Sequence, residues 1–440
     1  MYVYRRVGLL RKTKKISMKE LAKGIVSYSH LSNFECGRYN LSEDIMVSLS
    51  NKLQVPQEYL INYDEFDYEF NQKLIKFEKD IREKLLSEAK YTMDIIIKDY
   101  PFINSILQEI QFLILKCYFY INIEKNESAM KIFNDFINFM LIDENDIYRF
   151  SQNIVEIYFY LKGKLNYYNK DYIDSYYNYT IQLLYITNNI SKANTFYEIA
   201  ITLCCIGELN NSVYYAEKAL NIYLKELKWE DLSLTYNLIG FIYYKNNEII
   251  LAQGYYNKSL KIAKKFGLKN IQAEIYYNLA LIHKLHKNYD EALKSLYKSL
   301  EISNKSNTIL KKIYFCIIQV YIESNVIDKA EIKLKQVYKL QIDERDDYIL
   351  KLLEAEIFLL KYDYIYHEKY IEESLKFFYR NNDWEIVKKI CLKLSEYYAN
   401  SRKYKKACNY YKILCNLENI KNNDILKKQA EIKQSLNLYK

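Results

Sequence analysis

The chain has 440 residues, of which only eight are Gly and two are Pro. Because the turns between strands use Gly and Pro at special backbone angles, this composition argues against a protein with many strands and favours long helices. Apolar residues make up 50% of the chain and charged residues 27%, which excludes an intrinsically disordered chain and allows a large core.

The net charge of +9 is concentrated at the amino-terminal end. Residues 1–63 contain ten Lys and Arg against five Asp and Glu. A compact basic segment is the charge pattern of a module that binds the phosphate backbone of a nucleic acid. An excess of this size also occurs on ordinary solvated surfaces, so the charge alone does not decide the function.

Nothing in the chain resembles a targeting or membrane segment. Residues 1–17 are basic and lack the apolar run of a signal peptide. The longest uncharged stretch, residues 175–191, is too short and too polar for a bilayer span. The eight Cys are scattered and form no CxxC pair. We therefore expect a cytoplasmic protein with reduced thiols and no membrane partner.

Residues 1–63 predict a series of short helices. Ser17 and Glu20 form a capping-box pattern at the start of one helix. Ser27 is suited to cap the next helix, residues 28–36, and Gly37 fits the left-handed conformation that ends it. Ser42 is suited to cap a further helix. The residues expected in the core are Leu21, Ala22, Ile25, Leu31, Phe34, Ile45, Leu49, Leu53, Val55 and Leu60.

Two capped helices joined by a few residues are typical of a helix-turn-helix. The segment KISMKELAKGIVSYSHLSNFECGRYNLS resembles the Cro and phage-repressor (XRE) type. More narrowly, LAKGIVSYSHLSNFECG resembles the form found in the RRNPP group, the peptide-responsive regulators of Gram-positive bacteria. The resemblance covers residues 5–63 and implies that the second helix enters the major groove of an operator. The alternative is a degenerate helical domain used only for protein contacts.

Side chains at the start of the second helix are expected to reach base edges, and Asn33 is suited to bidentate reading of adenine. Asn33 stands where a basic residue is common in the group and Glu35 follows it, which argues against G-rich recognition. Free amides at the two Ser caps suit phosphates, and basic side chains add salt-dependent affinity. The predicted DNA-binding residues are Lys14, Lys15, Ser17, Lys19, Ser27, Tyr28, Ser29, His30, Ser32, Asn33 and Arg38.

Behind a predicted connector at residues 64–75, residues 76–440 show helical periodicity and an internal repeat of 37 to 40 residues. Each copy places a small residue in its first helix and another 12 positions later in its second. The pairs are Gly163/Ser175, Ala200/Ser212, Gly240/Ala252, Ala280/Ala292, Ile318/Ala330, Ala355/His367 and Ser395/Ala407. A weaker copy centres on Cys117 and Ala129.

These copies resemble tetratricopeptide repeats, although their period exceeds the usual length, and a HEAT-type helical repeat is the structural alternative. The expected fold is therefore all-α. It comprises an N-terminal helix-turn-helix domain at residues 1–63 and a right-handed α-solenoid of tetratricopeptide-like repeats at residues 76–440. The first helix of each repeat is expected to line a concave wall.

The expected wall combines amide and aromatic side chains, which suit an extended peptide because amides both donate to and accept from its backbone. Lys284 and Lys312 are suited to a peptide carboxylate. The resemblance makes Asn237 and Asn278 the strongest candidates, since the RRNPP group uses Asn residues of the first helices in this way. Such Asn residues also bond between neighbouring helices. The predicted peptide-binding residues are Asn194, Tyr197, Asn237, Phe241, Glu274, Asn278, Lys312 and Gln319.

No pattern in the sequence supports catalysis. His283, His286 and Asp290 follow one another at helical spacing, but His283 occupies an aromatic packing position, which favours packing over a metal site. The motifs GxGxxG, GxxxxGK[ST], GxSxG and HExxH do not occur. We expect no enzymatic activity, no cofactor and no metal.

Together these features predict a transcriptional regulator that binds double-stranded operator DNA and whose repeats bind a short signalling peptide of the quorum-sensing type. The peptide would change operator binding by changing the repeat superhelix or the dimer arrangement. A homodimer is expected because one small domain binds its half-site weakly. Two alternatives remain: a repeat adaptor that sequesters a partner protein or regulates a response regulator, and an aspartyl-phosphate phosphatase like relatives without the DNA-binding domain.

Overall fold

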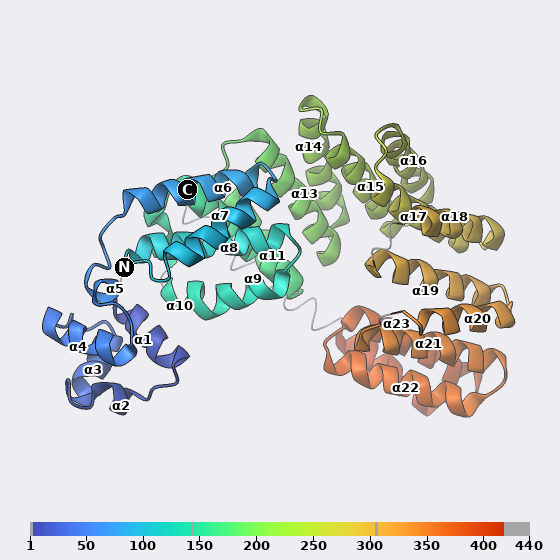
Figure 1. Ribbon diagram of the computed structural model, residues 1–440. Helices are drawn as coiled ribbons and strands as arrows, with labels where there is room; N and C mark the ends of the chain where they lie inside the picture. The colour runs from blue at the N-terminus through green and yellow to red at the C-terminus, as the bar shows by residue number, and fades with distance from the viewer. Residues whose placement is uncertain (1–2, 142–143, 304–306, 341, 418–440) are drawn as a thin grey trace. The chain divides into compact units, whose positions relative to one another are not determined.

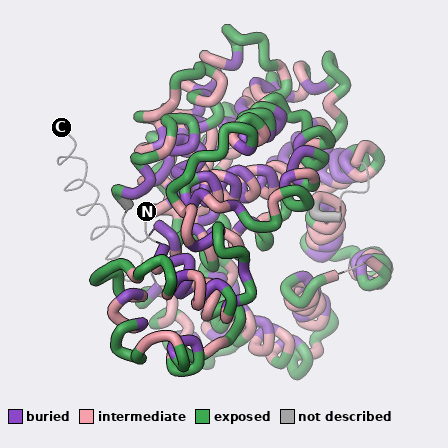
Figure 2. The backbone as a smooth tube through the Cα atoms, turned by 60° about the vertical axis from the view of Figure 1, so that its left-hand side comes forward, coloured by how far each residue is buried: buried purple, intermediate pink, exposed green. Residues whose placement is uncertain are grey.

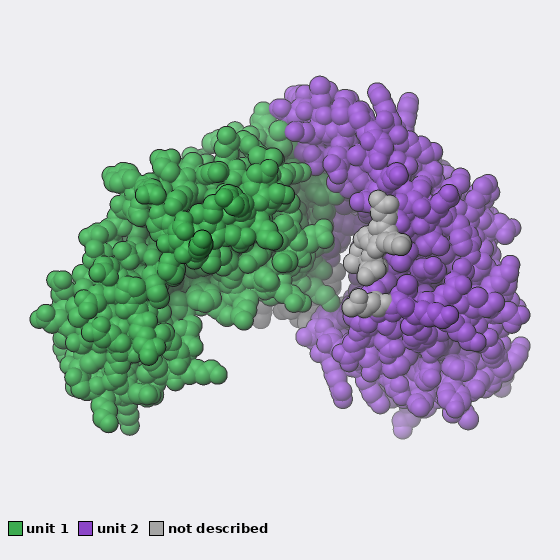
Figure 3. Space-filling view, viewed as in Figure 1, with its two compact units in different colours: residues 1–202 green, residues 203–440 purple. Residues whose placement is uncertain are grey.

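The computed structural model describes residues 3–141, 144–303, 307–340 and 342–417. These residues form helices joined by turns and contain no strand, which confirms the all-α class. The chain divides into two compact units, residues 1–202 and residues 203–440 (Figure 3). The division falls inside helix α13 (Asn189–Ile206).

Five short helices open the first unit: α1 (Val3–Thr13), α2 (Met18–Ala22), α3 (Tyr28–Glu35), α4 (Glu43–Leu53) and α5 (Gln57–Ile61). The Ser17 hydroxyl accepts a hydrogen bond from the Glu20 amide, and the Ser27 hydroxyl accepts one from the His30 amide. The structure therefore has two of the three predicted side-chain caps, whereas Ser42 stands at the N-cap of α4 without a capping hydrogen bond from its side chain. Helix α3 ends one residue before the predicted limit, because Gly37 takes a φ of +73° directly after the C-cap.

The core of these five helices follows the predicted apolar pattern with two differences. Leu21, Leu31, Phe34, Leu49, Leu53 and Leu60 are fully buried. Ile25 and Ile45 are only half-buried, and Met46 takes the place in the core that the four-residue spacing had assigned to Ile45. Figure 2 shows the buried residues between the helices and the exposed residues on their outer sides.

The first unit continues with longer helices. They are α6 (Tyr68–Arg82), α7 (Leu86–Asp99), α8 (Ile106–Asn122), α9 (Asn126–Ile132), the π-helix η1 (Phe133–Ile137), α10 (Asn138–Met140), the 3₁₀ helix η2 (Glu144–Arg149), α11 (Gln152–Tyr168) and α12 (Tyr172–Gln182). The Asp67 side chain caps α6 by accepting a hydrogen bond from the Phe70 amide. Helix α6 thus begins inside the predicted connector, and the domain boundaries remain predictions.

The second unit is a row of antiparallel helix pairs. Its helices are α14 (Leu209–Lys225), α15 (Trp229–Lys245), α16 (Ile249–Lys265), α17 (Lys269–Leu285), α18 (Tyr289–Ile302), α19 (Asn307–Glu323), α20 (Ile327–Val337), α21 (Glu344–Leu360), α22 (Tyr364–Arg380) and α23 (Trp384–Asn400), followed by a helical stretch at residues 404–417. The pairs follow one another along a curve (Figure 1). Helix α17 contacts both α15 and α19, and α19 contacts α21. The first helices of the pairs therefore lie on the inner side of the curve, where neighbours approach most closely.

The repeat alignment is reflected in the packing, since both members of each predicted pair are buried. At Gly240 the reason for a small residue is direct: an added Cβ would lie 2.7 Å from the ring of Tyr256. The same arrangement recurs at Gly163 with Tyr179. Where the first residue of the pair is Ala280, the position that corresponds to Tyr256 holds the smaller Leu296. In these three repeats a smaller residue on one helix faces a larger residue on the other.

Serine hydroxyls tie the two helices of a single pair together. Ser259 donates to the carbonyl of Ser233 at 2.6 Å, and Ser299 donates to the carbonyl of Ala273 at 2.6 Å. Ser374 makes the corresponding bond to Tyr348 at 3.3 Å. These repeated bonds between buried, neutral groups help to fix the distance between the two helices of these pairs.

Candidate functional site

Helix α3 presents one apolar side and one polar side. Leu31 and Phe34 enter the core, while Tyr28, Ser29 and His30 are exposed. Tyr28 is 50% exposed even though its side chain is large and largely apolar. The polar side of the helix is completed by Ser32 and Asn33, which are half-buried. The predicted base-reading residues therefore share one accessible side of one helix.

The predicted phosphate-binding residues are also accessible. Lys14, Lys15, Lys19 and Arg38 are exposed, as are the two capping residues Ser17 and Ser27. Within the part of the chain that the structure describes, none of these four cations forms an ion pair. Their charge is available to an external anion.

The negative charge of Glu35 does not weaken the attraction of this surface for an anion, because Arg11 neutralises the Glu35 carboxylate. The Arg11 guanidinium donates from Nε to Oε1 of Glu35 at 2.7 Å and from Nη2 to Oε2 at 2.8 Å. Both side chains are largely buried, and the hydrogen bond with Glu35 raises the pKa of Arg11. The acidic residue that the sequence places next to the reading positions is thus a structural partner of α1.

Two further cations of the basic amino-terminal segment face inward. The Arg6 guanidinium donates to the carbonyls of Tyr59 and Asn104, each at 2.6 Å, and to Glu109 of α8 at 2.7 Å. Arg5 donates to Asp146 of η2 at 3.3 Å. These arginines join the helix-turn-helix to the rest of the first unit. They are therefore not available to DNA, although they are among the ten basic residues of residues 1–63.

In the second unit, three predicted wall residues form a chain of contacts. The Asn278 Nδ2 group donates to Oδ1 of Asn237 at 2.9 Å, and both side chains are buried. Asn237 also hydrogen-bonds the Glu274 carboxylate. Because a carboxylate only accepts, the amide group of Asn237 must face Glu274 and its oxygen must face Asn278. The amide orientations are fixed by this chain.

The charges beside this chain are partly compensated. Glu274 is exposed, yet desolvation by its neighbours raises its pKa, while nearby Lys312 and the hydrogen bond from Asn237 counteract that rise. Lys312 is exposed. Lys284 donates to Gln319 at 2.8 Å and lies 3.5 Å from Glu323. Among the predicted residues, the structure therefore brings Asn237, Glu274, Asn278 and Lys312 together and places Gln319 in a separate contact with Lys284.

The other predicted wall residues are distributed differently. Phe241 lies under the Lys245 ammonium group, at 5.4 Å from the ring centre. Asn194 and Tyr197 belong to the first unit, where Asn194 is exposed and Tyr197 is half-buried. Sequence reasoning missed the buried pair Lys164 and Glu198, which are 2.6 Å apart. The sequence did contain a signal for this pair. Lys164 is one residue after Gly163 and Glu198 is two residues before Ala200, and both are positions that the repeat pattern assigns to the wall.

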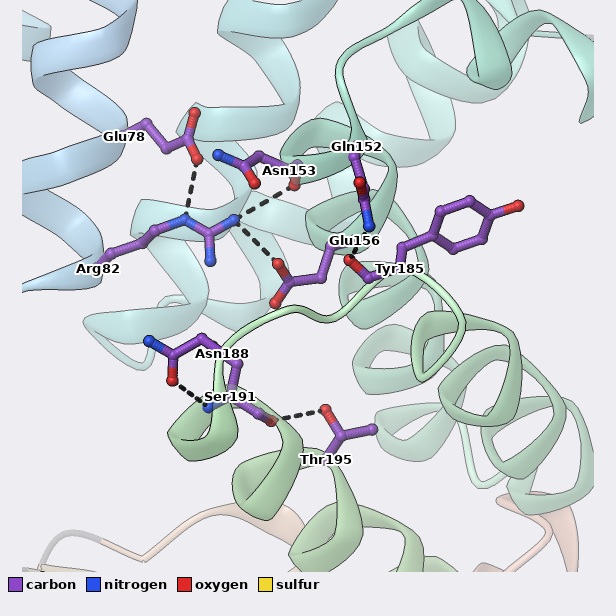
Figure 4. A network of polar contacts seen from close by, with 9 residues as sticks. All are labelled: Glu78, Arg82, Gln152, Asn153, Glu156, Tyr185, Asn188, Ser191 and Thr195. Atoms are coloured by element: carbon purple, nitrogen blue, oxygen red, sulfur yellow. Dashed lines mark hydrogen bonds and ion pairs between the residues drawn. The ribbon is translucent and has the colours of Figure 1, made fainter. Parts of the chain in front are cut away.

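The first unit also contains an open cleft of about 710 Å³ between α6, α8 and the start of α11. At its edge Arg82 donates to Glu78 at 2.9 Å and to Glu156 at 3.3 Å, and it also bonds the carbonyl of Asn153 (Figure 4). Burial raises the pKa of Glu156 despite the opposing effect of Arg82. Two carboxylates thus share one guanidinium, and sequence reasoning gave no sign of this cluster.

The described helices include none that is both long and apolar enough to cross a bilayer.

A helix-turn-helix with an accessible reading helix, followed by tetratricopeptide-like helix pairs, defines the class of this protein. A helix-turn-helix family matches residues 8–60, and a tetratricopeptide repeat family matches residues 231–305. The chain is 24% identical to the transcriptional activator NprA of Geobacillus stearothermophilus over 409 residues. This alignment covers 89% of the present chain and 97% of NprA.

Solved structures agree on the fold. A Rap protein in complex with the competence and sporulation factor superposes with a TM-score of 0.66 at 17% identity, over 81% of this chain and 99% of that protein. NprR in complex with its cognate peptide NprX superposes with a TM-score of 0.62 at 13% identity, again over 81% and 99%. Together with the matched families, these relatives confirm the resemblance to RRNPP-type regulators. The repeat match also favours tetratricopeptide repeats over the HEAT alternative.

Proposed function

We propose that this protein is a cytoplasmic transcriptional regulator that binds operator DNA through α3 and a short signalling peptide through its repeats. The observation that carries the DNA-binding half is the accessible polar side of α3, next to cations that form no ion pair among the described residues. Similarity to a transcriptional activator over nearly the whole chain supports the same role. The protein acts as a homodimer and has no catalytic activity.

The peptide-binding half is supported by the polar chain of Asn237, Glu274 and Asn278 on the inner helices α15 and α17. The oxygen of Asn278 is not used in its bond to Asn237, so it can accept a hydrogen bond from an extended peptide backbone. The nearby cation Lys312 suits a carboxylate of the same ligand. NprR, which has a similar fold, was solved with its cognate peptide NprX, and a Rap protein of similar fold was solved with the competence and sporulation factor.

DNA binding is tested by titrating salt in an assay with the protein's own promoter region. Each phosphate contact contributes about 0.9 to the slope of log affinity against log salt. Replacing Lys14, Lys15 or Lys19 by Gln is therefore expected to lower the slope by about this amount. Lys90→Gln, an exposed change on α7, is the matched control and should leave the slope unchanged. No binding at low salt would contradict the DNA-binding half.

Peptide binding is tested with synthetic peptides derived from small open reading frames beside the gene. Asn278→Ala removes both the outward acceptor and the bond to Asn237, so affinity should fall about tenfold or more. Asn257→Ala on the exposed side of α16 is the control and should bind as the wild type does. Equal affinities for both variants would place the peptide elsewhere.

A second candidate function is a repeat adaptor that holds a partner protein. The open cleft of the first unit, with its charged rim at Arg82, favours this alternative. A regulator and an adaptor respond differently to Tyr28→Ala, which alters the reading side of α3 only. Loss of regulation in cells with this variant supports the regulator, whereas unchanged regulation supports the adaptor.

A further inference from the structure

We infer that Asn33 and Arg38 together present only hydrogen-bond donors to the DNA and thereby select a guanine in the operator. The sequence alone predicts that Asn33 reads an adenine. This inference rests on the proposed DNA binding and adds the base that the site reads. It follows from how the turn after α3 is held against the helix.

The turn brings Arg38 back onto Asn33 by two hydrogen bonds. The backbone N–H of Arg38 donates to the carbonyl of Asn33 at 3.0 Å, which closes the end of the helix. The guanidinium Nη1 of Arg38 donates to Oδ1 of Asn33 at 2.8 Å. Gly37 makes this path possible with its φ of +73° and leaves room for the ring of Tyr4, which lies 2.6 Å from where a Cβ would stand.

Tyr39 fixes the same turn from its other end. Its hydroxyl donates to the carbonyl of His30 at 2.7 Å, and its ring meets the His30 ring edge-on at 4.8 Å. The residues that follow α3 are therefore bonded to the helix at two points one turn apart. Arg38 is held beside Asn33 before any DNA arrives, which lowers the entropy lost when both engage a base.

The chemistry of the two groups sets what they can recognise. A guanidinium has donors only, so the oxygen of Asn33 must face Arg38 and the amide N–H groups must face away. An adenine would bring its N6 amino group, another donor, beside the Arg38 guanidinium, which already uses one of the two lone pairs of the Asn33 oxygen and repels a second donor there. A guanine presents two acceptors, N7 and O6, which match the Asn33 amide and a free N–H of Arg38.

The charge of Arg38 is available for this contact. Glu35 is the acidic residue of α3, and its carboxylate is bound by Arg11 through both oxygens. Arg38 itself forms no ion pair within the described residues. The basic group that position 33 lacks is thus supplied by Arg38 from the following turn.

The test is selection of bound sequences from a random duplex pool by the full-length chain and by Arg38→Ala. The wild type should enrich guanine at one position of each half-site. Arg38→Ala, an exposed change, should lose that preference and gain adenine there, because the Asn33 oxygen becomes free. Lys19→Ala is the control: it should weaken binding to all sequences without changing the preferred base.

A second measurement uses the enriched duplex with 7-deazaguanine at the selected position, which removes the N7 acceptor. Wild-type affinity should fall about tenfold, whereas the affinity of Arg38→Ala should fall less, because without Arg38 the Asn33 amide is no longer held toward N7. Selection of adenine by the wild type, or an unchanged base preference in Arg38→Ala, would overturn the inference while leaving DNA binding intact. Failure of the wild type to enrich any sequence would overturn the proposed DNA binding, and the inference with it.

Discussion

Two regions of the molecule are stabilised by different kinds of polar contact. One is the junction between the helix-turn-helix and the rest of the first unit, and the other is the row of central repeats in the second unit. At the junction, buried charges are paired over long sequence distances, as in Arg6 with Glu109 and Arg5 with Asp146. In the repeats α15–α18, the buried polar contacts join neutral groups, such as Ser299 with the carbonyl of Ala273. The charged pairs occur once, at the junction, whereas the neutral serine contacts recur from one helix pair to another.

The difference has an energetic meaning. A buried charge that loses its partner remains in a medium that solvates it poorly, so its loss is expensive and one orientation is strongly preferred. A buried hydroxyl that is removed leaves only a small void and one weaker bond. We therefore expect the junction to respond sharply to single substitutions, whereas the repeats should respond gradually.

The largest effect is expected for Arg6→Met. This change removes the donor to three backbone carbonyls and leaves the Glu109 carboxylate with the Tyr59 hydroxyl but without its cation, so it should lower the free energy of unfolding by about 3–5 kcal/mol. Denaturant titration of the full chain measures it. Arg149→Met is the control, because its ion pair with Asp146 is longer, at 3.7 Å, and the Arg149 side chain is half exposed. Equal losses for the two variants would remove the contrast between buried junction and exposed surface.

A smaller effect is expected for Gly240→Ala in the repeats. The new methyl group would meet the Tyr256 ring, so overpacking should cost about 1–3 kcal/mol. The second change Tyr256→Leu should restore much of the loss, because it recreates the Ala280 and Leu296 combination of the next repeat. Thermal unfolding of the single and double variants tests this coupling. Strictly additive losses would mean that the repeats are not interchangeable at this position.

Ser299→Ala should have a weaker effect still. It removes the hydroxyl that bonds the carbonyl of Ala273, at a cost of about 0.5–1.5 kcal/mol. The exposed change Ser401→Ala provides the baseline in the same denaturant titration. A loss for Ser299→Ala as large as that for Arg6→Met would show that neutral contacts fix the repeats as tightly as charges fix the junction.

The smallest effect concerns pH. Desolvation by its neighbours raises the pKa of Glu274 although the side chain is exposed, so the folded chain holds this proton slightly more tightly than the unfolded chain does, and solvent screening keeps the effect small. The stabilising contribution is present below the unfolded pKa and is lost as pH rises through the folded pKa. The variant Glu274→Gln has no titrating group at this position, so its stability does not fall in this way as the pH rises. The difference in melting temperature between variant and wild type should therefore shift in favour of the variant between pH 4.5 and pH 7, and a constant difference would contradict the shift.

What the sequence predicts well is local. The caps at Ser17 and Ser27, the turn at Gly37 and the buried small residues of the repeats depend on neighbours within one or two helices. These signals are read from spacing alone. They were sufficient for the all-α class and for the order of the helix-turn-helix and repeats, which the matched families confirm.

What the sequence does not predict depends on pairing across the chain. Arg6 and Glu109 are 103 residues apart, and nothing near either residue marks its partner. The same holds for Asn237 and Asn278, which are 41 residues apart and whose amide orientation depends on a third residue, Glu274. Arg38 and Asn33 are close in sequence, but their contact requires the turn geometry. The DNA-binding and peptide-binding assignments of individual residues remain predictions.

Helix α1 packs into one apolar cluster that joins the helix-turn-helix to the longer helices of the first unit. Val7 is fully buried in the apolar cluster that includes the helix-turn-helix, while Arg6, its neighbour, is bonded to α8 and the residues before it. A fragment that ends near residue 63 would therefore carry an unpaired cation on a newly exposed face, and a fragment that begins near residue 64 would lack the partner of Glu109. Anyone dissecting the protein should expect each half to be soluble and well folded only after Arg6 or Glu109 is replaced by a neutral residue.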